Sequence, residues 1–168
     1  MKVKHQGTAK HYRTVWFDKS RNKVRLIEQR LLPHQFKIVS TVDYVETARA
    51  ITNMIVRGAG AIGATAAYGL AQGARAFQGQ GIKTFEKHIT KVFNMLAKAR
   101  PTAIDPVNAM RSIISDMNGT TVVERQSQAL ALAEQFADDD VTHCQALGQS
   151  GEPLIQENTR VLTHCNAG

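Results

Sequence analysis

AIGATAAYGLAQGARAF, residues 61–77, is a helix-length run that is rich in alanine and glycine. Each glycine in a helix interior costs about 1 kcal/mol relative to alanine, so Gly63, Gly69 and Gly73 need an offsetting reason. Small residues allow another backbone or a ligand to come close. The run therefore predicts a helix against which a neighbouring helix or a ligand packs tightly.

Further helical patterns flank this run. Apolar residues before it recur at spacings of three and four, which predicts a helix with one buried face: Val45, Ala48, Ile51 and Ile55. We expect that helix to begin after a cap at Ser40 or Thr41 and to stop at Gly58. Later helices are expected over 84–99, from Asp105 as cap to about 117, and from a cap at Thr120 over 122 to about 136 or 146.

The two ends of the chain have β-type patterns. Short strands are expected at 14–17, 24–28 and 36–40, with a hairpin loop at 18–23. Residues 1–12 are polar, and we expect them to be loose. Residues 160–165 form an apolar run that resembles the first strand of a doubly wound domain. The predicted fold class is α+β: an N-terminal β-meander (1–40), a helical bundle (41–157) and the first strand of an incomplete Rossmann-like domain (158–168).

Composition narrows the class of protein. The chain has 168 residues, of which 43% are hydrophobic, too many for a disordered chain. Neither a membrane span, which needs about 20 apolar residues, nor a secretory signal is expected. The two cysteines do not make a disulfide framework, which favours a reducing compartment, the cytoplasm.

The positive charge is localised. The net charge is +7, and residues 1–40 contain 10 Lys and Arg against 2 Asp and Glu. This segment could attract the phosphates of a nucleic acid. The favoured interpretation is solvated strand edges, where lysine discourages pairing with other strands, so nucleic acid is not expected as a partner.

A metal site is a further alternative. His143-Cys144 and His164-Cys165 together supply the four ligands of a zinc site. The pairs lack the tight CxxC spacing of common zinc modules, and no metal is expected.

Three motifs contain residues suited to chemistry. In VRGAGAIG (56–63), Arg57 precedes a glycine turn that opens a helix, and free amides at a helix start bind anions. In ARPTA (99–103), Arg100 lies at a rigid turn. In THCNAG (163–168), Cys165 follows a strand and offers a thiol. Taken singly, each motif is also compatible with a purely structural role: a solvent-facing arginine, an arginine on helix-terminal carbonyls, or an inert cysteine.

The order and spacing of these motifs resemble those of the methylthioribose-1-phosphate isomerase family. That family is related to the ribose-1,5-bisphosphate isomerases and to the regulatory subunits of a translation-initiation exchange factor. The resemblance extends from Thr14-Val15-Trp16 to Gly168, and it corresponds to about the first half of a typical member. VRGAxAIG and CNAG favour the methylthioribose branch.

The resemblance implies an aldose–ketose isomerase of methionine salvage that acts on a sugar phosphate, without metal or organic cofactor. By motif, Arg57, Gly58, Ala59 and Arg100 would bind the substrate, and Cys165 would be the active-site thiol. The partner would be a second copy or a complementing C-terminal half. Gly60 stands where the family usually has proline, which would make the loop more flexible and phosphate binding weaker. The family's catalytic aspartate would follow Gly168, so the isolated chain is expected to be inactive. The alternative is a non-catalytic subunit that either binds a sugar phosphate or is regulatory, like the translation-factor relatives.

Overall fold

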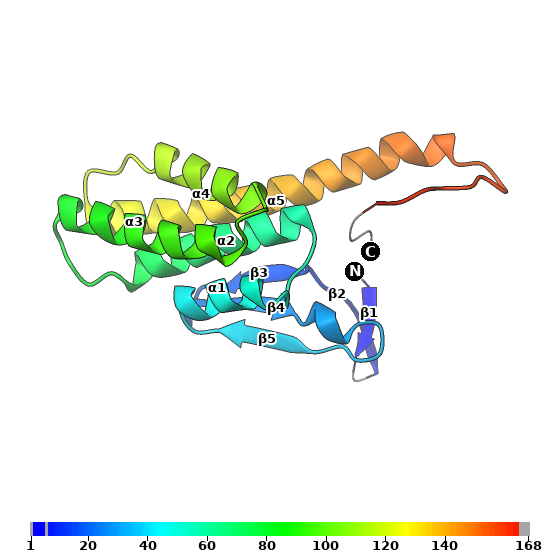
Figure 1. Ribbon diagram of the computed structural model, residues 1–168, viewed down its shortest axis with the longest axis horizontal. Helices are drawn as coiled ribbons and strands as arrows, with labels where there is room; N and C mark the ends of the chain where they lie inside the picture. The colour runs from blue at the N-terminus through cyan, green and yellow to red at the C-terminus, as the bar shows by residue number, and fades with distance from the viewer. Residues whose placement is uncertain (1, 6, 165–168) are drawn as a thin grey trace.

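The computed structural model describes residues 2–5 and 7–164. A layer of helices covers one face of a small sheet, and both described ends of the chain lie at the same end of the molecule (Figure 1). The helices are α1 (Tyr44–Thr52), α2 (Ala59–Ala76), α3 (Ile82–Ala99), α4 (Asp105–Asp116) and α5 (Val122–Gly151), with short 3-10 helices η1 (Gln29–Leu31) and η2 (Glu152–Leu154).

The sheet is an antiparallel meander in the order β3-β4-β5. Its strands are β3 (Val15–Asp18), β4 (Lys23–Ile27) and β5 (Ile38–Thr41), and each boundary lies within two residues of the predicted one. The register pairs Phe17 with Val24 and Val24 with Thr41, and because directly opposite residues lie on the same side of a sheet, these three share one face. That face meets α2, where Phe17 stacks on Tyr68 with ring centroids 5.6 Å apart.

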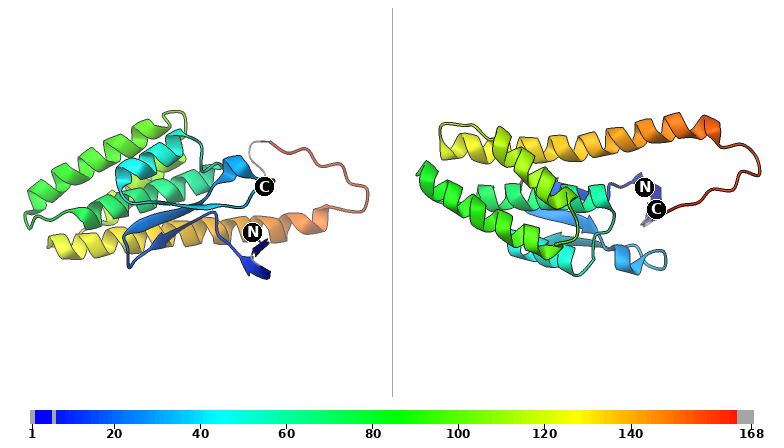
Figure 2. Two further views of the ribbon diagram at one scale, coloured as in Figure 1. Left: turned by 90° about the horizontal axis from the view of Figure 1, so that it is seen from below. Right: turned by 45° about the horizontal axis from the view of Figure 1, so that its top comes forward.

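Helix α2 is the centre of the fold. It contacts the other four helices as well as β3 and β4, and every residue from Ile62 to Ala74 is buried. Figure 2 shows the same arrangement from two further sides, with α5 extending past the ends of the other helices.

Three of the four glycines of α2 explain how neighbouring helices fit around it. A Cβ at Gly69 would lie 2.9 Å from Cγ2 of Thr47 in α1, and one at Gly73 would lie 2.7 Å from Cγ2 of Val92 in α3. On the other side, a Cβ at Gly63 would be 3.2 Å from the Phe136 ring of α5. The expectation of a tightly packed neighbour is confirmed, and at these three positions the neighbours are other helices.

A buried amide ties α2 to the sheet and to α1. The carboxamide nitrogen of Gln72 donates to the carbonyls of Asn22 (2.9 Å) and Thr41 (3.0 Å), while its oxygen accepts from the Thr47 hydroxyl (2.8 Å). Gln72 is fully buried. All of its polar atoms are therefore satisfied, as burial of an amide requires.

Several boundaries differ from the sequence expectations. Residues 1–12 were expected to be loose, but β1 (Lys2–His5) pairs with β2 (Thr8–His11) in a hairpin. The cap of α1 is Asp43, because Thr41 is the last residue of β5. Asp105 is the first residue of α4 rather than its cap.

The C-terminal region also differs from what the sequence predicts. Helix α5 runs to Gly151, beyond either predicted end, and starts with a capping box at Thr121, one residue after the predicted cap. Residues 160–164 belong to no strand in the part of the chain that the structure describes. The last four residues of the predicted Rossmann-like segment lie outside the described part of the chain. None of the helices in the described part is both long and apolar enough to cross a membrane.

We predict that Gly73→Ala lowers the free energy of unfolding by about 1–3 kcal/mol, because the new methyl group overpacks Val92. Gly148→Ala is the matched control, since a Cβ there meets nothing within 4 Å, and it should gain up to about 1 kcal/mol of helix propensity. Urea unfolding of both variants measures the difference. Equal stability of the two would show that α2 is not tightly packed at Gly73.

Candidate active site

Two connections between helices meet at one end of the bundle. The α1–α2 connection contains Arg57, and the α3–α4 connection contains Arg100. The hydroxyl of Thr52, at the end of α1, donates to the carbonyl of Ala99, at the end of α3, over 3.1 Å. The starts of α2 and α4 are also neighbours, since a Cβ at Gly63 would lie 3.4 Å from Cβ of Asp105. Figure 1 shows all four helix ends on the right-hand side of the bundle, where α5 projects.

The Arg57 turn has an unusual backbone. Gly58 is the N-cap of α2 and has φ of 90°, a conformation that glycine adopts without strain. Met54, four residues earlier, also has a positive φ, of 57°. Within the described residues, no side chain caps the start of α2. The backbone amides of its first turn therefore lack a side-chain acceptor at this end of the bundle.

Both arginines have unsatisfied nitrogens. Within residues 2–5 and 7–164, Nε of Arg57 and Nη1 of Arg100 are buried and lack a hydrogen-bond partner. Guanidinium nitrogens are obligate donors, and a buried donor without an acceptor is costly. An anion that reached these nitrogens would supply the acceptors that they lack.

A neighbouring segment holds the Arg57 turn in place. The amide of Arg57 donates to the side-chain oxygen of Gln29, and the amide of Gln29 donates to the carbonyl of Ile55 over 2.9 Å. Arg30 donates to the carbonyl of Asn53. Sequence reasoning missed these residues, because 28 positions separate Gln29 from Arg57 and nothing in the periodicity links them.

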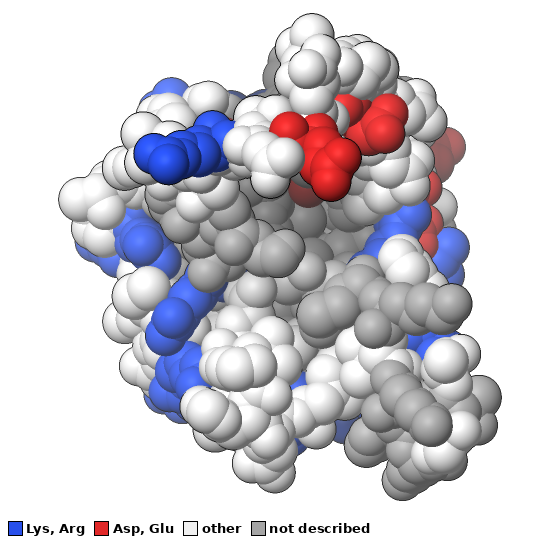
Figure 3. Space-filling model, turned by 90° about the vertical axis from the view of Figure 1, so that its right-hand side faces the viewer, with Lys and Arg blue, Asp and Glu red and all other residues white. Residues whose placement is uncertain are grey.

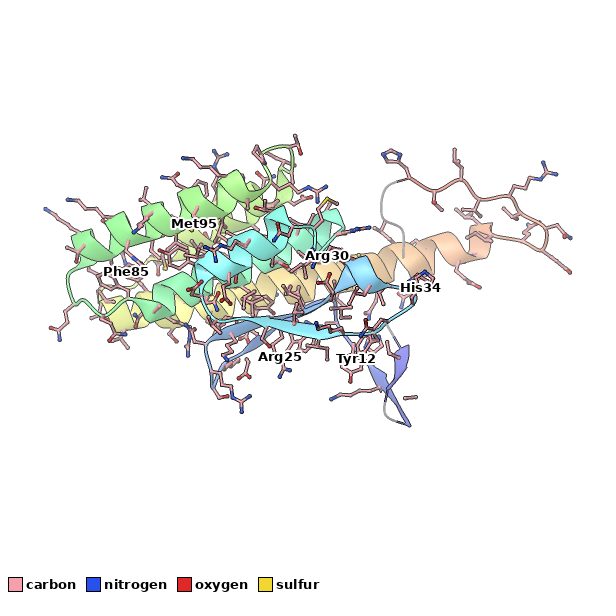
Figure 4. The ribbon with its side chains drawn as sticks, turned by 60° about the horizontal axis from the view of Figure 1, so that its bottom comes forward. Tyr12, Arg25, Arg30, His34, Phe85 and Met95 are labelled. Atoms are coloured by element: carbon pink, nitrogen blue, oxygen red, sulfur yellow. The ribbon has the colours of Figure 1, made fainter. Side chains whose placement is uncertain are left out.

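Glu28 fixes Arg30 in turn. The Glu28 carboxylate accepts from Nε of Arg30 (2.8 Å) and from Nη2 (2.6 Å). The side-chain hydrogen bonds from Arg30 lower the pKa of Glu28 below its usual value, although burial of the carboxyl opposes the shift. Figure 4 shows Arg30 beside η1, with Tyr12 and Arg25 on the sheet side and Phe85 and Met95 on α3.

A cavity of about 540 Å³ lies beside the start of α2. Its walls come from the β2–β3 connection, from α2 and from the middle of α5, and they include Arg13, Ala61, Asp140 and Cys144. Figure 3 views the molecule from this end, with acidic side chains gathered at the top and basic ones at the sides. The cavity is large enough for a small ligand.

Asp140 occupies space that Gly60 leaves open. A Cβ at Gly60 would overlap the Asp140 carboxylate, which therefore lies beside the first turn of α2. Asp138 and Asp139 are exposed, as expected for a solvated face, whereas Asp140 is partly buried. A carboxylate beside a helix start is favourable in itself, but it lowers the positive potential there.

Only the first two residues of the third motif, residues 163 and 164, belong to the described part of the chain. Cys165 lies outside the described residues, so its place relative to Arg57 and Arg100 stays a prediction. His143 and Cys144 lie on the exposed part of α5. In the described part of the chain, no group of three or more His, Cys, Asp or Glu could hold a metal ion.

Comparison with known proteins adds to this geometry. Residues 55–168 match the model of the "Initiation factor 2 subunit family". The chain is 40% identical to a methylthioribose-1-phosphate isomerase of Crocosphaera subtropica, over 94% of this chain and 46% of the relative. It is 36% identical to the same enzyme of Escherichia coli O45:K1, over 95% and 44%. The chain thus spans about half the length of the curated relatives it matches.

Two solved structures resemble the chain. A 5-methylthioribose 1-phosphate isomerase from Pyrococcus horikoshii superimposes with a TM-score of 0.80 and 32% identity, over 88% of this chain and 42% of that one. The delta subunit of translation initiation factor eIF-2B from A. fulgidus does so with a TM-score of 0.75 and 30% identity, over 88% and 43%.

We predict that Glu28→Gln destabilises the protein at neutral pH but not in acid. Because the folded state lowers the pKa of Glu28, ionised Glu28 stabilises the fold above its unfolded pKa, and this stabilisation is lost as the pH falls through the folded pKa. Urea unfolding of wild type and variant between pH 7 and pH 3 measures the gap, which should close toward low pH. Glu157→Gln, at an exposed position, is the control. A gap that stays constant with pH would contradict this account.

We also predict energetic coupling between positions 60 and 140. Gly60→Pro should destabilise the wild type, because the ring displaces the Asp140 carboxylate, and should be better tolerated in Asp140→Ala. A double-mutant cycle should give a coupling of about 0.5–3 kcal/mol. The same cycle with exposed Asp139→Ala should give none. Equal coupling in both cycles would show that Asp140 does not fill this space.

Proposed function

The chain belongs to the initiation factor 2 subunit family, and on that basis we propose that it forms the phosphate-binding part of a methylthioribose-1-phosphate isomerase. The observation that carries the proposal is the pair of buried guanidinium nitrogens, on Arg57 and Arg100, that lack acceptors beside the uncapped start of α2. The names of the relatives that match at 35–40% identity support the same activity.

The proposed reaction converts 5-methylthioribose 1-phosphate to 5-methylthioribulose 1-phosphate. Phosphate on the anomeric carbon leaves no free aldehyde, so the ring opens as a hydrogen moves from C2 to C1. The C2 hydroxyl loses its proton as the ketone forms, and the ring oxygen gains one. Arg57 and Arg100 hold the phosphate with charge-assisted hydrogen bonds, and the amides of Gly58 and Ala59 lie where the same oxygens would approach.

Cys165 is proposed as the thiol beside the reacting carbons, where it stabilises the transition state or takes part in hydrogen transfer. Two routes are compatible with this role: an enediol, which exchanges hydrogen with solvent, or a direct hydride shift, which does not. Incorporation of solvent deuterium into the product separates them. Exclusion of water from the site would strengthen the interactions of both arginines with the substrate.

We further propose that turnover needs a C-terminal half, supplied by the same polypeptide or by a complementing chain, in a homo-oligomer in the cytoplasm. Large apolar side chains are exposed along the end of the described chain: Leu147, Leu154, Ile155, Val161 and Leu162. A Rossmann-like domain that begins at residues 158–168 would cover them.

We predict that Arg57→Ala and Arg100→Ala each weaken binding of methylthioribose 1-phosphate to this chain by about 10- to 100-fold, because each removes charged hydrogen bonds worth about 1.5–3 kcal/mol. Isothermal titration calorimetry measures the affinity. Arg111→Ala, an exposed arginine of α4, is the matched control and should bind like wild type.

A further variant, at Cys165, tests catalysis once the C-terminal half is present. Cys165→Ser should abolish most turnover while it retains substrate binding. Unchanged affinity in both arginine variants would refute the site. Binding that depends on the arginines, without turnover by the completed protein, would favour the non-catalytic regulatory subunit.

A further inference from the structure

Two consecutive residues, Gln29 and Arg30, bond to the α1–α2 turn, and together with Glu28, which holds Arg30, they form what we call the 28–30 clamp. Gln29 makes two of these contacts: its amide donates to Ile55, and its side-chain oxygen accepts from the amide of Arg57. Arg30 donates to the carbonyl of Asn53. The clamp therefore contacts the turn at three positions within five residues.

The clamp is itself rigid. Glu28 is 5% exposed, and it holds the guanidinium of Arg30 through two hydrogen bonds of 2.8 and 2.6 Å. The amide of Glu28 also donates to the carbonyl of Lys37, over 2.9 Å, so its backbone continues the pairing of β4 with the β5 side of the sheet. The clamp thus transmits the position of the sheet to the turn.

The turn needs such support. It contains two positive-φ residues, Met54 and Gly58, and one of them carries a side chain that disfavours this conformation. α2 has no side-chain cap that would fix its entry. Among the described residues, Gln29 provides the only side chain that bonds to the backbone of Arg57.

We propose that Gln29 is a positioning residue for anion binding: its carboxamide oxygen holds the amide of Arg57, and through it directs the Arg57 guanidinium and the start of α2 toward the phosphate. This inference rests on the proposed function, because it specifies how the phosphate site is preorganised. Gln29 itself does not contact the substrate. Preorganisation of this kind raises affinity by reducing the ordering that binding requires.

The test compares three variants of the 168-residue chain. Gln29→Met keeps the length of the side chain but removes the acceptor, and Gln29→Glu keeps an acceptor oxygen. Gln35→Met makes the same substitution at an exposed position and is the control. The readouts are hydrogen exchange at the Arg57 amide, affinity for methylthioribose 1-phosphate, and the urea midpoint of unfolding.

We expect the Arg57 amide to exchange about tenfold faster in Gln29→Met, which is the size of effect that loss of one hydrogen bond gives. The affinity should fall about tenfold, while the urea midpoint stays close to that of Gln35→Met. Gln29→Glu should retain the protection of the amide. A merely structural role would lower the midpoint and would leave the affinity of the folded protein unchanged.

Unchanged exchange at Arg57 in Gln29→Met, or equal loss of protection in the Met and Glu variants, would overturn the inference. Failure of the wild-type chain to bind the sugar phosphate would instead overturn the proposed function. The exchange measurement is made without ligand, so the two failures are distinguishable.

Discussion

The close approach of α1 and α3 to the glycines of α2 is the constraint on which the rest of the structure depends. At Gly69 and Gly73 the neighbouring side chains occupy the space that a Cβ would need. Because the glycines carry no side chain, the axes of the neighbouring helices can lie close to the axis of α2, and α2 can be buried on all sides. The buried amide of Gln72 then fixes how this helical core sits on the sheet, because any other placement would leave its polar atoms unsatisfied.

The location of the candidate site follows from that packing. Because α1 and α3 both lie against α2 and both end at the same side, their C-terminal connections meet there. Each connection carries an arginine, and the first connection leads into the start of α2. The sheet contributes through the clamp at Gln29, so the layer opposite the helices also shapes the Arg57 turn. A site made from short connections is thereby held by rigid elements on two sides.

Local signals in the sequence predicted the elements and the Arg57 turn, because helix periodicity, caps and glycine act over a few residues. They did not predict contacts over long separations. Gln29 and Asp140 reach the start of α2 from 28 and 80 positions away, respectively, and neither has a distinctive pattern around it. The hairpin of residues 2–11 was missed because its polar strands lack the alternation that marks a half-buried sheet. The final apolar run was expected to be a strand, and without a sheet beside it no ladder forms over 160–164.

The central claim is that two arginines from separate connections grip one phosphate. A crystal structure of the chain with methylthioribose 1-phosphate tests it most directly. The account predicts phosphate oxygens within hydrogen-bonding distance of both the Arg57 and the Arg100 guanidinium groups, at the first turn of α2. A phosphate bound at another part of the surface, or one that contacts a single arginine while the other faces solvent, would contradict it.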